Sequence, residues 1–185
     1  HPRNFLSKSD ELKLINTIKE KKEILNELGV DELIIQEFNN DFSNLSADEF
    51  IGHLIKYCKI KEIIVGFNHK FGKDREAGIY ELKTYGNKYS FDVTEISAFE
   101  INQINISSTK IRNAIVEGKV ELCSQYLGYN FSLNGTIVKG KSRGKEIGYP
   151  TANINIEEHY KIIPKNGVYF VSCKIQSIEK FGMMN

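Results

Sequence analysis

The sequence predicts an α/β protein in two parts, a first part with a parallel β-sheet and a second part of antiparallel strands. Two observations support this prediction. Up to residue 127, apolar runs of strand length alternate with segments of helical periodicity, in an order typical of a parallel sheet. From Phe131 onward, apolar and polar residues alternate with a period of two between glycines, which favours antiparallel strands. We therefore expect one domain over residues 1–127 and a second over residues 128–185, with a boundary near Gly128.

Composition and charge exclude several classes of protein. The chain has 185 residues, of which 41% are hydrophobic and 26% are charged, and its net charge is +1. This content supports a buried core, and the balanced charge gives no reason to expect a nucleic-acid partner. No apolar run approaches the ~18 residues of a membrane span. We expect a cytoplasmic protein that binds small molecules and neither membranes nor nucleic acid; the sequence predicts no particular oligomeric state.

The cysteines fit the same compartment. Cys58, Cys123 and Cys173 are far apart and odd in number, and they form no C-x-x-C pair. We expect three buried free thiols in a reducing environment, with no disulfide and no cysteine-bound metal. The four histidines are equally scattered, and no two of them have the spacing of metal ligands.

In the first part, periodicity and capping residues predict the helices and strands. A helix over residues 9–28 ends at Gly29, and a capping box of Ser46 and Glu49 opens another helix that runs to Cys58. The other expected elements are strands over 33–35, 62–66 and 89–96 and a helix over 79–85. The strands over 33–35 and 62–66, with the helix between them, would form a right-handed βαβ unit, and ligands of such sheets bind beyond the carboxyl ends of the strands.

The loop that follows the strand over 62–66 contains candidate ligand groups. Residues 65–72 read Val-Gly-Phe-Asn-His-Lys-Phe-Gly, with two aromatic and three polar side chains between the glycines. One interpretation is a turn whose two aromatic side chains pack into the core. The other is a ligand loop, in which Asn68 would contact a substrate and His69 would be either a polar partner or an exposed loop residue.

Three hydroxyl residues stand at the start of a helix in the stretch Ile-Ser-Ser-Thr-Lys-Ile-Arg at 106–112. Apolar residues at helical spacing follow, Gly118 ends the helix, and a second helix is expected over 120–127. Serine and threonine at a helix start bond its unpaired N–H groups, and that end of the helix suits an anion such as a phosphate. Lys110 and Arg112 add positive charge. The alternative is an ordinary N-cap followed by two solvated bases.

The second part is expected to contain strands near residues 133–138, 152–156 and 168–174. The first two flank a loop over 139–145 in which four basic residues alternate with small ones. This loop is either a solvated hairpin loop or a cover for phosphates, because glycines let backbone N–H groups approach an anion. Thr151 and Asn153 follow, two apart in a predicted strand, so their oxygens would share one face and suit magnesium.

Three of these stretches resemble, in the same order, signatures of the bacterial bifunctional riboflavin kinase/FMN adenylyltransferases. The 106–112 stretch is similar to the adenylyltransferase signature, and the 65–72 loop is similar to a loop beside the nucleotide and the flavin. The run over 144–153 is similar to the riboflavin kinase signature. The resemblance implies a Rossmann-like nucleotidyltransferase domain followed by an antiparallel β-barrel. It also implies that riboflavin is phosphorylated by ATP to FMN, and that FMN is adenylylated to FAD with release of pyrophosphate.

The resemblance also implies roles for individual residues. Catalytic roles in adenylyl transfer fall to Ser108, Thr109 and Arg112. Magnesium would be held by Thr151 and Asn153. Flavin contacts would come from Asn68, Phe71 and Tyr169. Nucleotide-binding residues would be Ser107, Ser108, Thr109, Arg112, Asn68, Gly140, Lys145, Gly148, Thr151 and Asn153.

The chain departs from the family pattern at both ends. A His-Pro-Arg run, here residues 1–3, lies in the middle of the family's first domain, and the His-x-Gly-His loop that precedes it is absent from these 185 residues. The strands that supply the kinase's catalytic carboxylate are absent too. We therefore expect a partial first domain, a partial barrel and an inactive fragment. Two other interpretations are an adenylyltransferase for another substrate and a non-catalytic flavin-binding or regulatory protein.

Overall fold

The computed structural model describes residues 12–98, 100–101, 104–140, 143–146, 148–149, 151–175 and 178–185. The chain divides into two compact units, His1–Asp10 with Ile34–Asn105 and Glu11–Leu33 with Ile106–Asn185. These compact units are not the two consecutive domains expected from the sequence, and the domain boundary near Gly128 stays a prediction. The opening His-Pro-Arg run lies outside the described residues.

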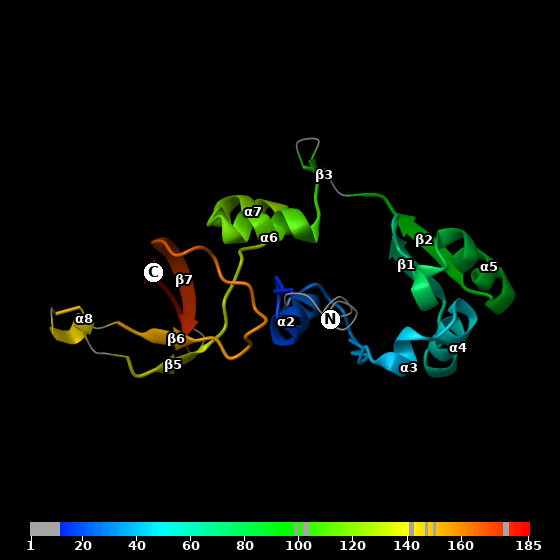
Figure 1. The fold of residues 1–185 in the computed structure, drawn as a ribbon, viewed down its shortest axis with the longest axis horizontal. Helices are drawn as coiled ribbons and strands as arrows, with labels where there is room; N and C mark the ends of the chain where they lie inside the picture. Colours follow the sequence, from blue (N-terminus) through cyan, green and yellow to red (C-terminus); the bar gives the residue numbers. More distant parts are fainter. Residues whose placement is uncertain are drawn as a thin grey trace. The chain divides into compact units, whose positions relative to one another are not determined.

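The first unit contains a βαβ arrangement. Strands β1 (Glu62–Gly66) and β2 (Asp92–Ile96) pair in parallel, and helix α5 (Ile79–Tyr89) connects them (Figure 1). A parallel pair was predicted between the strands over 33–35 and 62–66, and it is found between β1 and the following strand, β2. The strand expected over 33–35 was wrong: these residues are irregular, Ile34 and Ile35 are 63% and 60% exposed, and no strand in the described residues pairs with them. An apolar run becomes a buried strand only where a neighbouring strand accepts its hydrogen bonds.

The helices of this unit begin where capping residues predict. Helix α4 (Ala47–Tyr57) has Ser46 as its N-cap in a capping box with Glu49, which confirms the prediction. Helix α5 extends past its predicted end at residue 85, and β2 begins at residue 92 instead of 89. Tyr89, which was assigned to the strand, stacks on Tyr85 one helical turn away, with ring centroids 6.4 Å apart. Pairing at this spacing stabilises a helix.

The core of the first unit lies between α4, α5 and the parallel strands. Its buried apolar residues are Ala47, Ile51, Val65, Phe71, Ala77, Leu82 and Phe91. The smaller elements of the unit are α3 (Asn40–Ser43), the 3-10 helix η1 (Lys73–Arg75) and an antiparallel pair of β3 (Glu100–Ile101) and β4 (Ile104–Asn105).

In the second unit, helix α2 (Ile18–Glu27) begins later than predicted. Thr17 is its N-cap, in a capping box with Glu20, and residues 12–17 are not helical. The predicted start at residues 9–11 lies outside the described residues. Leu14, which was assigned to the helix, instead forms an isolated parallel bridge with Lys161. The Thr17 cap explains the correction, because a capping box marks where a helix starts.

Helices α6 (Ser108–Val116) and α7 (Val120–Leu127) follow the sequence prediction. The turns after them are made by Gly118 and Gly128, both with φ of +77°. These left-handed angles are the reason for glycine at both positions. The buried core of this unit is formed by Ile111, Ala114, Ile115, Cys123 and Ile162. Of the three thiols expected to be buried, Cys123 is buried, whereas Cys58 is half-buried and Cys173 is exposed.

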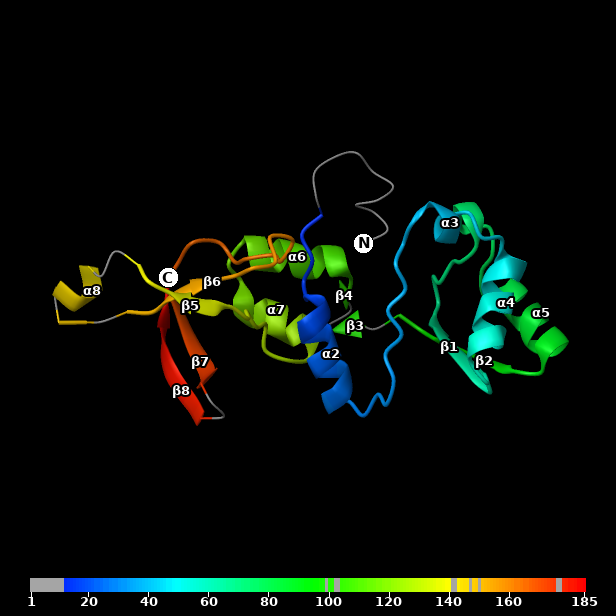
Figure 2. The ribbon, with the colours of Figure 1, turned by 90° about the horizontal axis from the view of Figure 1, so that it is seen from below.

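The later part of the second unit consists of two antiparallel pairs. Strand β5 (Thr136–Val138) pairs with β6 (Asn153–Asn155), and β7 (Tyr169–Ile175) pairs with β8 (Ile178–Met184), which was not predicted (Figure 2). A helical turn, α8 (Arg143–Glu146), interrupts the basic loop. The fold class is therefore mixed α/β, while closure into a barrel stays a prediction. No helix in the described ranges is long and apolar enough to cross a membrane.

Candidate functional site

The start of α6 is organised by its N-cap residue. Ser107 has extended backbone angles, and its hydroxyl oxygen accepts a hydrogen bond from the Lys110 N–H at 3.3 Å. Serine at this position satisfies one of the N–H groups that a helix start leaves unpaired. Ser108 and Thr109 form the first turn, and both are exposed. Their hydroxyls and N–H groups lie at the positive end of the helix, where an anion is stabilised.

Arg112 is held by a contact that is distant in sequence. Its side chain is half-buried, and Nε donates to the backbone carbonyl of Lys13 at 3.0 Å. The helix that carries it is anchored by Ile111 and Ile115, which are 7% and 0% exposed. Lys110 is exposed, as the interpretation of two solvated bases expects, whereas Arg112 is half-buried and bound to a backbone carbonyl. The guanidinium plane is oriented by a fixed carbonyl on a neighbouring segment.

The predicted ligand loop lies at the carboxyl end of β1, in the first unit. The His69 N–H donates to the Gly66 carbonyl at 2.9 Å, which closes a turn with Asn68 exposed at its tip. The His69 ring stacks on Phe71, with centroids 6.0 Å apart and an angle of 21° between the planes. Partial burial of the imidazole, and then the charge of Arg75, lower the pKa of His69. Neutral imidazole is thereby favoured in this loop.

The two aromatic side chains of this loop differ. Phe71 is 6% exposed and lies against Phe50, with ring centroids 5.7 Å apart, whereas Phe67 is 55% exposed. Packing into the core is therefore correct for Phe71 and wrong for Phe67. Because core packing already explains Phe71, its contact with a flavin stays a prediction, as does that of Asn68.

The structure brings together residues predicted to bind nucleotide in the second part. A Cβ placed on Gly140 would lie 2.0 Å from Nδ2 of Asn153, and one placed on Gly144 would lie 3.1 Å from Oγ1 of Thr151. Gly140 therefore leaves room for the side chain of Asn153, whereas at Gly144 the nearest atom to an added Cβ is the backbone carbonyl oxygen of Tyr149, at 2.2 Å. Asn153 is in β6, but Thr151 precedes the strand, so the expectation that both lie in one strand was wrong.

The other residues of this region are placed less completely. Gly148 has φ of +81°, a left-handed conformation that favours glycine. Lys145 belongs to the helical turn α8. Residues 141, 142 and 150 lie outside the described residues. Within the described part of the chain, no three His, Cys, Asp or Glu residues are placed to hold a metal ion, so magnesium would depend on neutral oxygens such as those of Thr151 and Asn153.

Tyr169 is fixed at the start of β7. Its hydroxyl donates to the carbonyl of Lys165. The hydroxyl also lies close to the turn between α6 and α7, since a Cβ on Gly118 would come within 2.9 Å of it. Its predicted flavin contact would therefore involve the ring and not a free hydroxyl.

Comparison with known proteins assigns the chain to a family. The family model described as FAD synthetase matches residues 1–110, more than half of the chain. The chain belongs to the FAD synthetase family. In this FAD synthetase family member, residues 127–185 match a further family model, described as riboflavin kinase. The order of the two matches agrees with the family resemblance predicted from the three motifs, and that resemblance is confirmed.

Several curated relatives are similar over most of this FAD synthetase family member. Bifunctional riboflavin kinase/FMN adenylyltransferases from Buchnera aphidicola subsp. Schizaphis graminum and Listeria monocytogenes are 38% and 35% identical, over 97% and 99% of the chain. The chain spans 58% of the length of each of these relatives. A crystal structure described as a macrolide-efflux protein from Streptococcus pneumoniae is also similar, with a TM-score of 0.87, 32% identity, and coverage of 99% of this chain and 59% of that one.

The sequence did not predict the buried ion pair of this FAD synthetase family member. Oε2 of Glu20 lies 2.6 Å from Nζ of Lys161, and the two side chains are 2% and 0% exposed. The spacing of Thr17 and Glu20 could have identified the carboxylate as part of a capping box. No local signal identifies Lys161, which directly follows a turn and forms an isolated bridge with Leu14. An open depression of about 320 Å³ beside Glu20 is lined by α2, Leu28, residues 128–130 and Ser132, and contains none of the predicted site residues.

Proposed function

We propose that this chain belongs to a bifunctional enzyme of flavin cofactor biosynthesis. In the first reaction, a riboflavin hydroxyl attacks the γ-phosphorus of ATP, ADP leaves and FMN forms. In the second, the FMN phosphate attacks the α-phosphorus of another ATP, pyrophosphate leaves and FAD forms. The observation that carries the proposal is the capped start of α6 with its fixed arginine, in a chain that matches FAD synthetase and riboflavin kinase models in succession.

In the adenylyl transfer, the start of α6 would bind the phosphates of ATP. Ser107 caps the helix, which leaves Ser108 and Thr109 exposed to donate hydroxyl and backbone hydrogen bonds. The positive end of the helix and the guanidinium of Arg112 would stabilise the charge that builds up on the departing pyrophosphate. Because Arg112 is already oriented by a carbonyl, little reorganisation would be needed when the phosphates arrive.

In the phosphoryl transfer, the loop between β5 and β6 would close on ATP. Gly140 and Gly144 leave space beside Asn153 and Thr151, so these hard oxygens fit a magnesium ion shared with phosphates. When bound, magnesium would offset negative charge on the phosphates. Lys145 and the glycine N–H groups of the loop would add further positive partners for the nucleotide, and Gly148 permits the turn that leads to Thr151.

Flavin contacts are proposed for three residues in two regions. Asn68 is exposed on the loop after β1 and can offer both an amide donor and a carbonyl acceptor. Phe71 could contact a flavin only at the edge that the core leaves open. Tyr169 offers its ring, since its hydroxyl is engaged with Lys165.

A product assay on the full-length protein tests the proposal. Riboflavin, FMN and pantetheine phosphate are supplied separately with ATP and magnesium, and FMN, FAD, ADP and pyrophosphate are separated and quantified. We expect FMN and ADP from riboflavin, and FAD and pyrophosphate from FMN. Pyrophosphate release with pantetheine phosphate alone would identify a different adenylyltransferase. Flavin binding without turnover of either substrate would identify a non-catalytic binding protein.

A further inference from the structure

A short segment before α2, residues 13–17, is held by other elements through successive backbone groups. The carbonyl of Lys13 accepts from Nε of Arg112 at 3.0 Å. The next residue, Leu14, donates its N–H to the Tyr160 carbonyl at 2.7 Å and accepts from the Ile162 N–H at 2.9 Å. The position of the Lys13 carbonyl is therefore tied to the irregular segment that contains residues 160–162.

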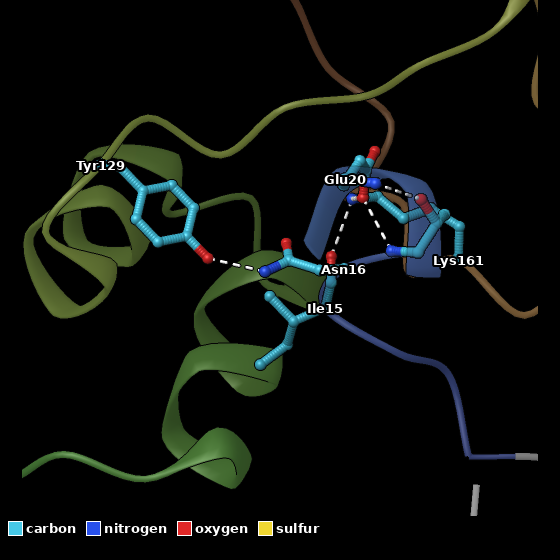
Figure 3. A network of polar contacts seen from close by, with 6 residues as sticks. Ile15, Asn16, Glu20, Tyr129 and Lys161 are labelled. Atoms are coloured by element: carbon cyan, nitrogen blue, oxygen red, sulfur yellow. Dashed lines mark hydrogen bonds and ion pairs between the residues drawn. The ribbon is translucent and has the colours of Figure 1, made fainter. Parts of the chain in front are cut away.

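The side chain of Lys161 adds an anchor on the following residue. Its Nζ donates to the Ile15 carbonyl at 2.7 Å and to Oε2 of Glu20 at 2.6 Å (Figure 3). The same carboxylate oxygen accepts from the Thr17 N–H at 2.8 Å. Three consecutive carbonyls, those of residues 13–15, are thus bound by three different residues. With two neighbouring residues fixed, the direction of the Lys13 carbonyl is set.

This ion pair is costly as a source of stability alone. Both side chains are almost completely buried, and burial lowers the pKa of Lys161 despite the neighbouring carboxylate. Oε1 of Glu20 is buried and has no hydrogen-bond partner within the described residues. Replacing a buried pair by apolar groups is often neutral or stabilising, whereas a pair can hold one geometry against alternatives. The Lys161 ammonium also lies 4.5 Å from the centre of the Phe131 ring, which fixes its approach.

We infer that Lys161, together with Glu20, is a positioning residue for Arg112. The pair fixes the 13–17 segment, the segment fixes the Lys13 carbonyl, and that carbonyl orients the guanidinium expected to bind phosphate. The segment lies in the part matched by FAD synthetase, and Lys161 lies in the part matched by riboflavin kinase. Arg112 itself lies between the two matched parts, so a lysine of the second part would set the geometry of an arginine outside it. This inference rests on the proposed role of Arg112 in adenylyl transfer.

The test compares three variants of the full-length protein, and adds Lys161→Met to an Arg112→Ala background. Lys161→Met removes the ammonium and keeps the stem, and the double variant Glu20→Gln with Lys161→Met removes both charges. The control is Lys119→Met, which breaks an exposed ion pair with Glu117 at the end of α6, the helix that carries Arg112. For each protein, kcat and KM for ATP are measured in FAD formation from FMN, alongside riboflavin phosphorylation and the thermal unfolding midpoint.

We expect Lys161→Met to lower kcat for FAD formation by roughly ten- to a hundredfold, the scale of a misplaced catalytic group, with a smaller change in KM. In Lys161→Met, the rate of riboflavin phosphorylation should stay within about twofold of wild type. In the Lys119→Met control, kcat for FAD formation should also stay within about twofold of wild type. The double variant should regain the unfolding midpoint but not the kcat, because stability and positioning are separate effects. In an Arg112→Ala background, Lys161→Met should cause no further loss.

Three results would overturn the inference. They are recovery of kcat together with the midpoint in the double variant, equal loss of both activities, and a full additional loss in the Arg112→Ala background. A wild-type protein that forms no FAD from FMN would instead refute the proposed function, and the inference with it. The wild-type assay therefore tests the proposed function, and the variant assays test the positioning role of Lys161.

Discussion

The two predicted phosphate sites of the chain differ in how far the described residues organise them. At the start of α6, Ser107 caps the helix, Ile111 and Ile115 are buried, and Arg112 is bound by a carbonyl. Around β6, by contrast, Thr151 and Asn153 are exposed, and their surroundings are set mainly by the space that glycines leave. A helix start defines its own geometry through local hydrogen bonds, whereas a loop and strand edge depend on partners.

The largest effect is expected at the organised site. Arg112→Ala in the full-length protein should lower FAD formation from FMN by roughly 10²–10³-fold, the scale for loss of one preorganised transition-state contact. Riboflavin phosphorylation should continue, because it uses the other site. Both rates are measured by product separation from the two substrates in parallel. Equal loss of both activities would show that Arg112 is structural.

A smaller effect is expected at the exposed site. Thr151→Val keeps the β-branched shape and removes the oxygen, and the position is exposed, so folding should be little disturbed. FMN formation from riboflavin should fall by most of its value, roughly ten- to a hundredfold, as for a weakened metal site. FAD formation from supplied FMN should continue. Normal riboflavin phosphorylation with unchanged magnesium dependence would remove the kinase assignment from this region.

The glycine space itself can be tested next. Gly140→Ala adds a Cβ that would meet the amide of Asn153 at 2.0 Å, so the side chain must move. We expect the rate of FMN formation to fall several-fold, up to about tenfold, which is the smallest loss expected when a metal ligand is displaced. Gly52→Ala is the matched control, because nothing lies within 4 Å of its added Cβ. Wild-type rates of FMN formation in both Gly140→Ala and Gly52→Ala would show that the space beside Asn153 is not needed for the reaction.

The cap of α6 should give a modest effect with two separable parts. Ser107→Ala removes the side chain that accepts from Lys110 and should cost about 1 kcal/mol of unfolding free energy. Ser107→Asp keeps an acceptor and should restore that stability, but its negative charge should raise KM for ATP in FAD formation. Chemical denaturation and ATP titration measure the two parts. An unchanged KM with the aspartate would place the phosphates away from this helix start.

The last effect, confined to alkaline pH, concerns the buried thiol of α7, Cys123. Burial raises the pKa of Cys123 to about 11 from its ordinary value of 9.0. Between these two values the unfolded chain releases the proton and the folded chain keeps it, so this group makes the folded state less stable as pH rises from 9 towards 11. The loss should be smaller in Cys123→Ala, as followed by thermal unfolding across this range. An identical slope in the two proteins would contradict the assignment.

The sequence predicted those parts of the structure that local interactions determine. The capping box at Ser46 and the N-cap at Ser107 marked true helix starts, and the glycines at 118 and 128 marked true helix ends. The strand–helix–strand order over 62–96 and the strands β5, β6 and β7 followed from periodicity, whereas β8 did not. At the candidate site, the hydroxyls of α6 were correctly placed at a helix start.

The remaining features depend on contacts between distant residues. The segment over 33–35 reads as a strand but has no partner among the described strands, and Leu14 has helical periodicity but pairs with Lys161 instead. The fixation of Arg112 by Lys13 could not be predicted either, because its donor and acceptor are 99 residues apart. Periodicity reports the faces of an element and not its neighbours.

The pairing of Leu14 with the segment around Lys161 has a consequence for synthesis on the ribosome. The Lys161 side chain and its acceptor at Ile15 are 146 residues apart in the chain. At ~5–20 residues per second, roughly 7–30 s pass between the emergence of the two partners. During that interval the carboxylate of Glu20 lacks the Lys161 ammonium, and the carbonyls of Leu14 and Ile15 lack their partners Ile162 and Lys161. The helix α2 can therefore complete its packing only after residue 161 has emerged, and until then chaperones and proteases can reach it.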